Sequence, residues 1–451
     1  MNTSMIRKYN VPGPRYTSYP TVPYWNETPP SERTWKFYIQ QTYQASRAQG
    51  VSLYIHLPYC ESLCTYCGCT THITVNHAVE QPYIDALLKE WSMYVSILDE
   101  PPLIREIHLG GGTPTFFRSE NLKQLIQGIC NLGSLSDTAE LSFEAHPNNT
   151  SAEHLRTLFQ LGFRRISLGI QDFDPNVQKQ INRMQTYEQV QKITELARQI
   201  GYTSINYDLI FGLPLQTTDS IRHTMEQTIR LRPDRIAFYS YAHVPWMKPA
   251  QQSFEASLPD EQTKRTLYEE GKRLLKQGGY QEIGMDHFAL PSDALCQASQ
   301  QGYLHRNFMG YTTQATQLLI GLGASAISDT WTAFGQNTKT IKSYLQAIQE
   351  NNLPIERGHE LTEEDLLIRE HILNLMCIGK TCWDECLEEN RVLNQSLYRL
   401  EAMEEDQLVA LGSNSIRILK KGKPFVRNVC MALDAHLWRK SPKTQLFSMT
   451  V

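Results

Sequence analysis

The chain has 451 residues, of which 41% are hydrophobic and 20% are charged, and its formal net charge is −4. This composition is typical of a globular enzyme and excludes a largely disordered chain. The sequence contains no apolar run of about 18 residues that would predict a membrane helix, and no basic cluster that would indicate nucleic-acid binding.

Residues 1–35 are polar, rich in proline and tyrosine, and show no clear periodicity. Four tyrosines lie between Tyr9 and Tyr24, whereas disordered tails contain few aromatic residues. We therefore expect an N-terminal arm that packs against the rest of the protein. The first ten residues lack the apolar core of a signal peptide, so the ten cysteines favour a reducing compartment, the cytoplasm.

A group of cysteines follows the first predicted strand, which is an apolar run over residues 51–57. Cys60, Cys64 and Cys67 have the spacing C-x3-C-x2-C, and Cys69 follows two residues later. Three thiolates can hold three irons of a [4Fe–4S] cluster and leave the fourth iron open for a small ligand. A disulfide framework or a four-cysteine zinc site is the alternative, but zinc ligands usually form two separated pairs. The spacing favours the cluster.

Strands and helices alternate from residue 51 onwards, which predicts βαβ units and a parallel sheet. Helical patterns cover, for example, 81–98 and 187–200. We expect an α/β fold, namely a partial (β/α)6 TIM-like barrel over 36–345, and a full eight-stranded barrel stays open as an alternative. The six predicted strands are 53–57, 106–109, 140–144, 165–169, 205–211 and 235–241.

Several of these strands end in polar or glycine-rich groups. Active-site groups of such folds gather at the carboxyl ends of the strands, so a ring of ligand-binding residues is expected there. Gly111 and Gly112 allow the backbone to approach a ligand closely, and Arg183 can bind a carboxylate with two hydrogen bonds. The strand-end groups are Gly110–Pro114, Glu144, Gln171, Asp208 and 241–243.

The character of the sequence changes after about residue 345. A helix is predicted over 361–376, opened by the capping signal at Thr362, and a hairpin is predicted over 408–419. Residues 346–451 should therefore form a small, mainly helical domain that resembles a winged helix. The absence of a strongly basic face argues against DNA binding.

The region 54–69 resembles the radical S-adenosylmethionine (SAM) superfamily. Further stretches narrow this resemblance to the oxygen-independent coproporphyrinogen III oxidases, and it covers nearly the whole chain. These stretches are 110–115 (GGGTPT), 13–20 (GPRYTSYP), 284–289 (GMDHFA) and 305–314 (HRNFMGYTTQ).

The resemblance implies an anaerobic oxidoreductase that decarboxylates two propionates of coproporphyrinogen III to vinyl groups, giving protoporphyrinogen IX. It implies a [4Fe–4S] cluster held by Cys60, Cys64 and Cys67, with Cys69 expected to influence activity without being a ligand. It also implies two SAM molecules, an electron donor such as flavodoxin or ferredoxin, and a monomer. Tyr54, Gly111, Glu144, Ala242 and Ile327 match the first SAM site, and Tyr66, Gly112, Thr113, Gln171, Arg183 and Asp208 match the second.

Two positions depart from the family pattern. Met309 stands where the family has glutamine, and His146 stands where it has an acidic residue. Methionine cannot replace the hydrogen bonds of an amide, so handling of the second SAM is expected to be weaker unless Gln314 compensates. Arg15 and Arg306 are the best candidates to bind substrate propionates, with ordinary surface or ion-paired arginines as the alternative.

Two other functions remain as alternatives. A haem chaperone of the related branch would keep the cysteine motif, but it would lack the N-terminal arm and the HRNF stretch. A radical SAM methyltransferase or a haem-degrading enzyme of the same neighbourhood is the other alternative.

Overall fold

A twelve-stranded sheet organises the computed structural model, which describes residues 3–26, 28–384, 391–440 and 446–450. Its strand order is β16-β15-β14-β13-β1-β4-β5-β6-β7-β8-β10-β9. The six central strands are parallel neighbours, which confirms the predicted partial barrel. They are β1 (Val51–Leu57), β4 (Leu103–Gly111), β5 (Ser134–Ala145), β6 (Arg165–Gln171), β7 (Ser204–Phe211) and β8 (Arg235–Ser240).

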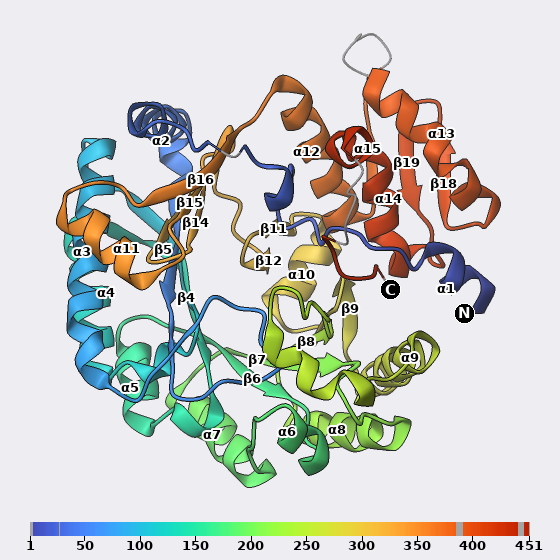
Figure 1. Cartoon of the computed structure of the whole chain (residues 1–451), viewed down its shortest axis with the longest axis horizontal. Helices are drawn as coiled ribbons and strands as arrows, with labels where there is room; N and C mark the ends of the chain where they lie inside the picture. Colours follow the sequence, from blue (N-terminus) through green and yellow to red (C-terminus); the bar gives the residue numbers. More distant parts are fainter. Residues whose placement is uncertain (1–2, 27, 385–390, 441–445, 451) are drawn as a thin grey trace.

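Helices on the outside of the barrel connect these strands (Figure 1). In α7, which begins after a capping box formed by Thr186 and Gln189, the buried residues Val190, Ile193 and Ala197 recur at helical spacing and face the sheet. The outer face of the parallel strands is therefore covered by helices. The connecting helices are α3 (Glu80–Leu98), α4 (Ser119–Leu132), α5 (Ala152–Gln160), α6 (Pro175–Gln180), α7 (Tyr187–Ile200) and α8 (Thr218–Leu231).

Six short strands extend the sheet on both sides. Strand β13 (Leu318–Leu322) runs parallel to β1, and β14 (Ile327–Asp329), β15 (Ala333–Asn337) and β16 (Ile355–Glu360) follow it antiparallel. Strands β10 (His287–Ala289) and β9 (Gln281–Gly284) extend the other edge of the sheet, and they follow helix α9 (Glu261–Gln277) in the sequence. The sheet passes the predicted boundary at residue 345, and the division of the chain into domains stays a prediction.

The C-terminal part combines helices with a small sheet of three strands. Helix α12 (Glu363–Ile378) and the hairpin of β18 (Val409–Gly412) and β19 (Ser415–Ile418) confirm the predicted helix and hairpin. Strand β17 (Lys380–Cys382), which the sequence analysis did not predict, pairs with β19. The remaining helices described here are α13 (Arg391–Glu405), α14 (Val426–Leu433) and α15 (Ala435–Arg439).

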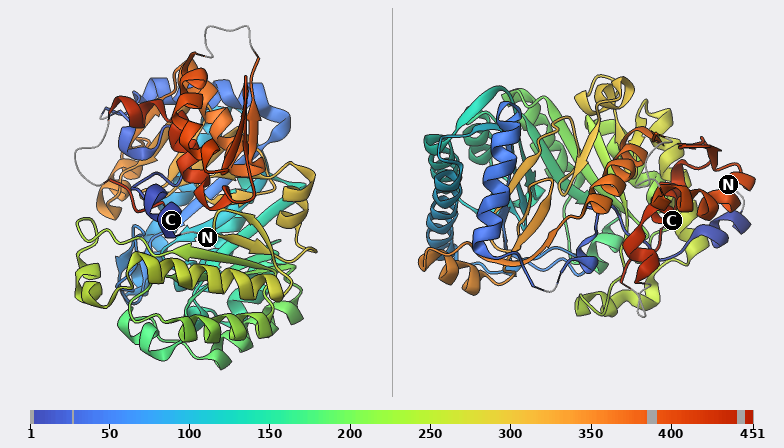
Figure 2. Two further views of the ribbon diagram at one scale, coloured as in Figure 1. Left: turned by 90° about the vertical axis from the view of Figure 1, so that its right-hand side faces the viewer. Right: turned by 90° about the horizontal axis from the view of Figure 1, so that it is seen from above.

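The N-terminal arm packs into this C-terminal part, as its tyrosines predicted. Tyr9, Tyr16 and Tyr19 are buried in one apolar cluster with residues of α12, α13 and α14. Arg427 of α14 donates hydrogen bonds to the carbonyls of Gly13 and Pro14 in the arm. Figures 1 and 2 show the two chain ends on this same side of the molecule.

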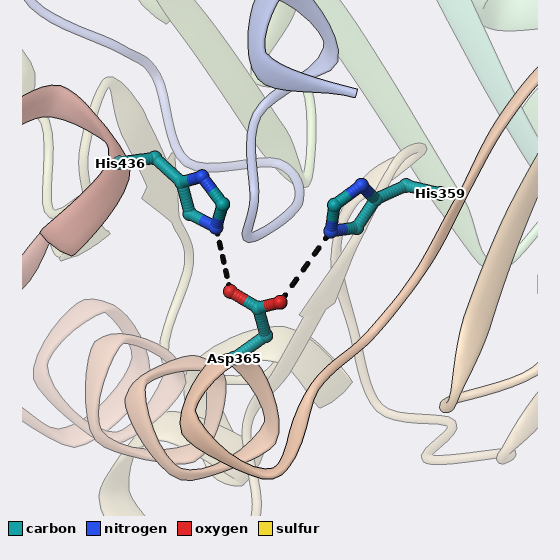
Figure 3. A group of neighbouring side chains, drawn as sticks. All are labelled: His359, Asp365 and His436. Carbon is teal, nitrogen blue, oxygen red and sulfur yellow. Dashed lines mark hydrogen bonds and ion pairs between the residues drawn. The ribbon is translucent and has the colours of Figure 1, made fainter. Parts of the chain in front are cut away.

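A buried carboxylate joins the barrel, the start of α12 and the last helix (Figure 3). Asp365 accepts hydrogen bonds from His436 Nε2 at 2.7 Å and His359 Nε2 at 3.4 Å. It also completes the capping box with Thr362, and Tyr19 of the arm packs edge-on against His436. The three segments are therefore fixed by one side chain.

None of the described helices is both long enough and apolar enough to cross a membrane.

Candidate active site

The loop after β1 brings its four cysteines to the mouth of the barrel. Cys60, Cys64, Cys67 and Cys69 all line a cavity of 250 Å³. The loop is anchored by the segment after α6, because Thr65 N–H donates to the Ile181 carbonyl at 3.1 Å and Asn182 Nδ2 donates to the Leu63 carbonyl at 2.7 Å. The cysteine positions are therefore held from outside the loop.

The arrangement of the thiols suits a cluster better than a single ion. Ligands of one zinc lie about 4 Å apart, since each Zn–S bond is about 2.3 Å. Within the described ranges, only His359, Asp365 and His436 bring three possible ligand atoms within 4.8 Å of one another. Cys60, Cys64 and Cys67 surround one cavity at wider spacing, as an iron–sulfur cluster requires.

The pKa of the Cys60 thiol also indicates that a bound cation is needed to stabilise the thiolate. Burial raises the pKa of Cys60 to about 11, although a hydrogen bond with Thr113 acts in the opposite direction. A buried thiolate therefore needs compensation of the kind that iron supplies. The site residues present fit the cluster that the cysteine spacing predicts.

Cys69 contacts a predicted ligand and belongs to the same loop. Its thiol hydrogen-bonds Cys67, which lowers the pKa of Cys67 and raises that of Cys69. Its carbonyl accepts a hydrogen bond from Lys248 Nζ at 2.6 Å. Cys69 is thus placed to donate to a ligand thiolate, and its predicted role outside the ligand set stays a prediction.

Gly111 and Gly112 bring the end of β4 against the cysteine loop. Gly111 has φ of +110°, and a Cβ there would lie 2.5 Å from the His56 ring. A Cβ on Gly112 would lie 2.7 Å from the backbone of Pro58. Only glycine fits these positions. The next residue, Thr113, places its hydroxyl 3.3 Å from Cys60 Sγ.

Glu144 lies near the end of β5, Asp208 lies within β7 on the other side of β6, and both line the same cavity. Glu144 accepts a hydrogen bond from Gly111 N–H at 3.1 Å and lies 3.5 Å from His108 Nε2. Burial raises the pKa of Asp208 to about 6, and the charge of Glu144 adds to this rise. The two carboxylates therefore create negative potential at the strand ends, which suits a cationic ligand such as a sulfonium or ammonium group.

Gln171, at the end of β6, and Arg183 line the same cavity. Gln171 has φ of 69° at a register shift of β6, an uncommon backbone conformation that is typical of functional sites. Arg183 donates from Nη2 to the Gly169 carbonyl at 2.5 Å and from Nη1 to Cys64 Sγ at 3.5 Å. Its buried Nε has no partner. A cation with an open hydrogen-bond donor therefore faces the thiol group.

Most of the predicted site residues are brought together on this one cavity. They are Cys60, Cys64, Tyr66, Cys67, Cys69, Gly111, Gly112, Thr113, Glu144, Gln171, Arg183 and Asp208.

Tyr54 and Ile327 lie beside this cavity rather than on its wall. The Tyr54 ring stacks on His108, which is the neighbour of Glu144. Tyr54 pairs with Gly321 across β1 and β13, and a Cβ on Gly321 would meet the Ile327 carbonyl at 2.4 Å. The two residues therefore belong to one packed layer under the site.

Ala242 is connected to the cysteine loop by a residue that sequence reasoning missed. Gln251 Nε2 donates to the Tyr66 carbonyl at 3.0 Å and to the Ala242 carbonyl at 3.3 Å. Gln251 lies in a short 3-10 segment 185 positions from Tyr66, so no local signal could have identified its contact with the cysteine loop.

A second cavity of 190 Å³ adjoins the first. Both are lined by Glu144, Ser167, Asp208 and Tyr239. Tyr239 was missed, although its place near the end of β8 was the available signal.

The two departures from the family pattern also lie here. Met309 lines the second cavity, and Gln314 donates to Glu140 at 3.4 Å. His146 lines the first cavity, and burial lowers its pKa to about 3, so it is neutral at physiological pH and cannot supply the negative charge of the family residue.

Comparison with known proteins places this site in a family. The Radical SAM superfamily model matches residues 54–228. Oxygen-independent coproporphyrinogen III oxidase from Synechocystis is 36% identical, covering 100% of this chain and 98% of the relative. The Escherichia coli relative of the same name is 37% identical over 99% of this chain and 98% of the relative.

A solved structure agrees with these sequence matches. Coproporphyrinogen III oxidase (HemN) from Escherichia coli, a radical SAM enzyme, superposes with a TM-score of 0.90 at 35% identity, covering 97% of this chain and 99% of the other. Taken with the cysteine loop and the strand-end residues, these full-length similarities show that the chain belongs to the oxygen-independent coproporphyrinogen III oxidase family of radical SAM enzymes.

Proposed function

We propose that this protein catalyses the anaerobic oxidative decarboxylation of coproporphyrinogen III, converting two propionates to vinyl groups and giving protoporphyrinogen IX. The observation that carries the proposal is the cavity on which three C-x3-C-x2-C thiols meet the strand-end residues, in a chain related over its full length to oxidases of this name. When bound, the cluster and SAM supply the electron and the 5′-deoxyadenosyl radical that removes hydrogen from a propionate.

The protein holds and orients the reactants. Cys60, Cys64 and Cys67 would bind the cluster, while Glu144 offers a carboxylate to the cationic end of SAM. Arg183, with its open Nε, would pair with a carboxylate of SAM.

The proposal includes the binding of two SAM molecules by each chain. The support is that residues matching both SAM sites meet on the 250 Å³ cavity, with Gly111 and Glu144 from the first site and all six residues of the second. The first would use Tyr54, Gly111, Glu144, Ala242 and Ile327, and the second would use Tyr66, Gly112, Thr113, Gln171, Arg183 and Asp208.

A cytoplasmic protein that receives electrons from a flavodoxin or ferredoxin is also part of the proposal. The nine cysteines among the described residues form no disulfide, which is typical of reducing compartments. Leu63 and Ile73, near the cysteine loop, are 43% and 41% exposed and offer an apolar contact for a donor protein.

Anaerobic turnover tests the proposed function directly. Reconstituted protein is mixed with coproporphyrinogen III, SAM and a reductant, and the oxidised products are separated by chromatography. We expect protoporphyrin from the natural protein and none from the Cys60→Ser variant. Methylated tetrapyrroles would instead support a methyltransferase, and tight haem binding without turnover would support a chaperone.

A further inference from the structure

A third cavity lies on the other side of β8, outside the cysteine site. It has a volume of 730 Å³ and lies between the edge strand β9, the N-terminal arm and the C-terminal helices. This size is in the usual range for small-molecule sites, about 300–1,000 Å³. Its apolar wall includes Tyr268, Ile283, Leu375 and Met376. The cavity can therefore accept a bulky ligand with an apolar centre.

Cations outnumber carboxylates around this cavity. Glu282 lines it but is already bound by Lys272 at 2.6 Å and Lys276 at 3.2 Å. Asp286 is the other carboxylate on its wall. Burial raises the pKa of Asp286, while four nearby cations lower it. These cations are Arg15, Arg427, Arg306 and Lys264.

The positive charges around Asp286 are not balanced by an equal number of carboxylates, so they repel one another. Burial lowers the pKa of Lys264 to about 8, and the charges of Arg15 and Arg427 add to this effect. Burial likewise lowers the pKa of Arg427 to about 9, with Arg15 again contributing. Neighbouring cations with one shared carboxylate attract an anion.

Arg306 is the cation in this group with open hydrogen-bond capacity. It is 6% exposed, and its Nε and Nη1 have no hydrogen-bond partner. Its guanidinium lies 4.6 Å from the centre of the Tyr311 ring. A buried guanidinium without a carboxylate is costly for the folded state. Such a group is expected where a ligand supplies the missing anion.

The position of Arg306 is between the two binding regions. Its guanidinium lies over the ring of Tyr311, which lines the cavity beside Asp208. The Tyr311 hydroxyl accepts from Met285 N–H at 3.2 Å and donates to the Met376 carbonyl at 3.0 Å, and both of these residues line the large cavity. A ligand that reaches from the SAM region to the large cavity would therefore pass this guanidinium.

Arg15 forms the second half of the arrangement. It donates to the Ser240 carbonyl at 3.0 Å and lies 3.4 Å from Asp286. This ion pair is long, so a ligand carboxylate can compete for the guanidinium. Arg427, in contrast, donates its N–H groups to backbone carbonyls near both chain ends. Among the arginines around Asp286, Arg306 and Arg15 are thus the ones left to contact an anion.

We propose that Arg306 and Arg15 bind the two propionates that the reaction leaves intact, so that this half of the tetrapyrrole lies toward the 730 Å³ cavity. This inference rests on the proposed function, which supplies a tetrapyrrole with four propionates. The reacting pair must lie toward the cysteine cavity, where the radical forms. The retained pair then points away from it, toward the cation cluster.

Truncation of the arm is unsuitable as a test, because Tyr9, Tyr16 and Tyr19 belong to the C-terminal core. We would substitute Arg306→Met and Arg15→Met in the full-length, reconstituted protein. Arg164→Met is the control for loss of a guanidinium over an aromatic ring, because Arg164 lies 3.9 Å from the centre of the Phe159 ring and is not among the cations around Asp286.

Porphyrin binding is measured by fluorescence with coproporphyrin III and with protoporphyrin IX, which carries only the retained propionates. We expect Arg306→Met to weaken both ligands about 10- to 100-fold, Arg15→Met to weaken both less, and Arg164→Met to change neither. Iron content and SAM affinity should stay at natural values, the unfolding midpoint should not fall, and Arg306→Lys should restore part of the affinity.

Three outcomes would overturn the inference: unchanged affinity for both porphyrins in both variants, a loss confined to coproporphyrin III, or an equal loss in the Arg164 control. Turnover of coproporphyrinogen III by the natural protein is measured in parallel. Normal turnover with unchanged porphyrin affinity of the variants would reject the subsite alone. Absent turnover with the expected affinity losses would reject the proposed function and keep the carboxylate site.

Discussion

The carboxylate of Glu144 gives the sharpest test of the SAM site. One of its oxygens accepts the Gly111 N–H at 3.1 Å, while the side chain is 43% exposed toward the cavity. We expect it to accept a charge-assisted hydrogen bond from SAM, and such bonds contribute about 1.5–3 kcal/mol. Because solvent screens a half-exposed group, the lower part of that range applies, which corresponds to roughly 10- to 30-fold in affinity.

Glu144→Gln keeps the size of the side chain and removes its charge. SAM affinity is measured by equilibrium binding to anaerobically reconstituted protein, with iron content determined on the same samples. Glu153→Gln, on the exposed side of α5, is the control and should bind SAM normally. Unchanged affinity of the Glu144 variant with a full complement of iron would refute the assignment, whereas loss of iron would show that Glu144 supports the cluster loop instead.

Four further predictions concern other parts of the molecule. Cys69→Ser should keep its iron and Cys60→Ser should lose it, and the reverse pattern in an iron assay would contradict the ligand assignment. Burial raises the pKa of Asp208 to about 6, so SAM affinity should fall as pH drops through about 6, and an Asp208→Asn variant that keeps this pH dependence would exclude Asp208 as its source. Met309→Gln should raise turnover or reduce the mono-decarboxylated intermediate, and no change in either would indicate that Met309 only packs. Burial raises the pKa of Asp365, but its hydrogen bonds outweigh burial and hold the pKa well below the usual value. Its stabilisation is therefore present above about pH 4 and lost as pH falls further. Asp365→Asn should lower the free energy of unfolding by about 3 kcal/mol at pH 7, as checked by denaturant titration.

The central strands could be predicted because each contains apolar residues, in a run as in β1 or in alternation as in β5, and has a polar or glycine-rich group near its end. The structure places β6 and β7 within one or two residues of the predicted bounds. The added strands β10 and β14 contain only three residues each. Their pairing depends on the sheet edge already being present, so their own sequences carry no usable periodicity.

The site residues also fall into those that the sequence reveals and those that only the tertiary structure reveals. The cysteine spacing is local in sequence, and so the thiol group could be recognised directly. Gln251 donates to the Tyr66 carbonyl, which is 185 positions away in sequence. Arg306 can be recognised only from the structure, where its buried Nε and Nη1 have no hydrogen-bond partner. Residues of this kind act through tertiary placement, which spacing along the chain does not encode.

The contact between the two chain ends has a consequence for biosynthesis. Val11 accepts a hydrogen bond from Thr450 N–H at 2.9 Å, and Gly13 N–H donates to the Ser448 carbonyl at 3.1 Å. At about 5–20 residues per second, a ribosome needs roughly 20–90 s to travel between these partners. The arm that carries Arg15 is made first but gains its binding surface last. A nascent chain can thus complete its barrel before it can complete the 730 Å³ cavity that Arg15 and Thr450 line.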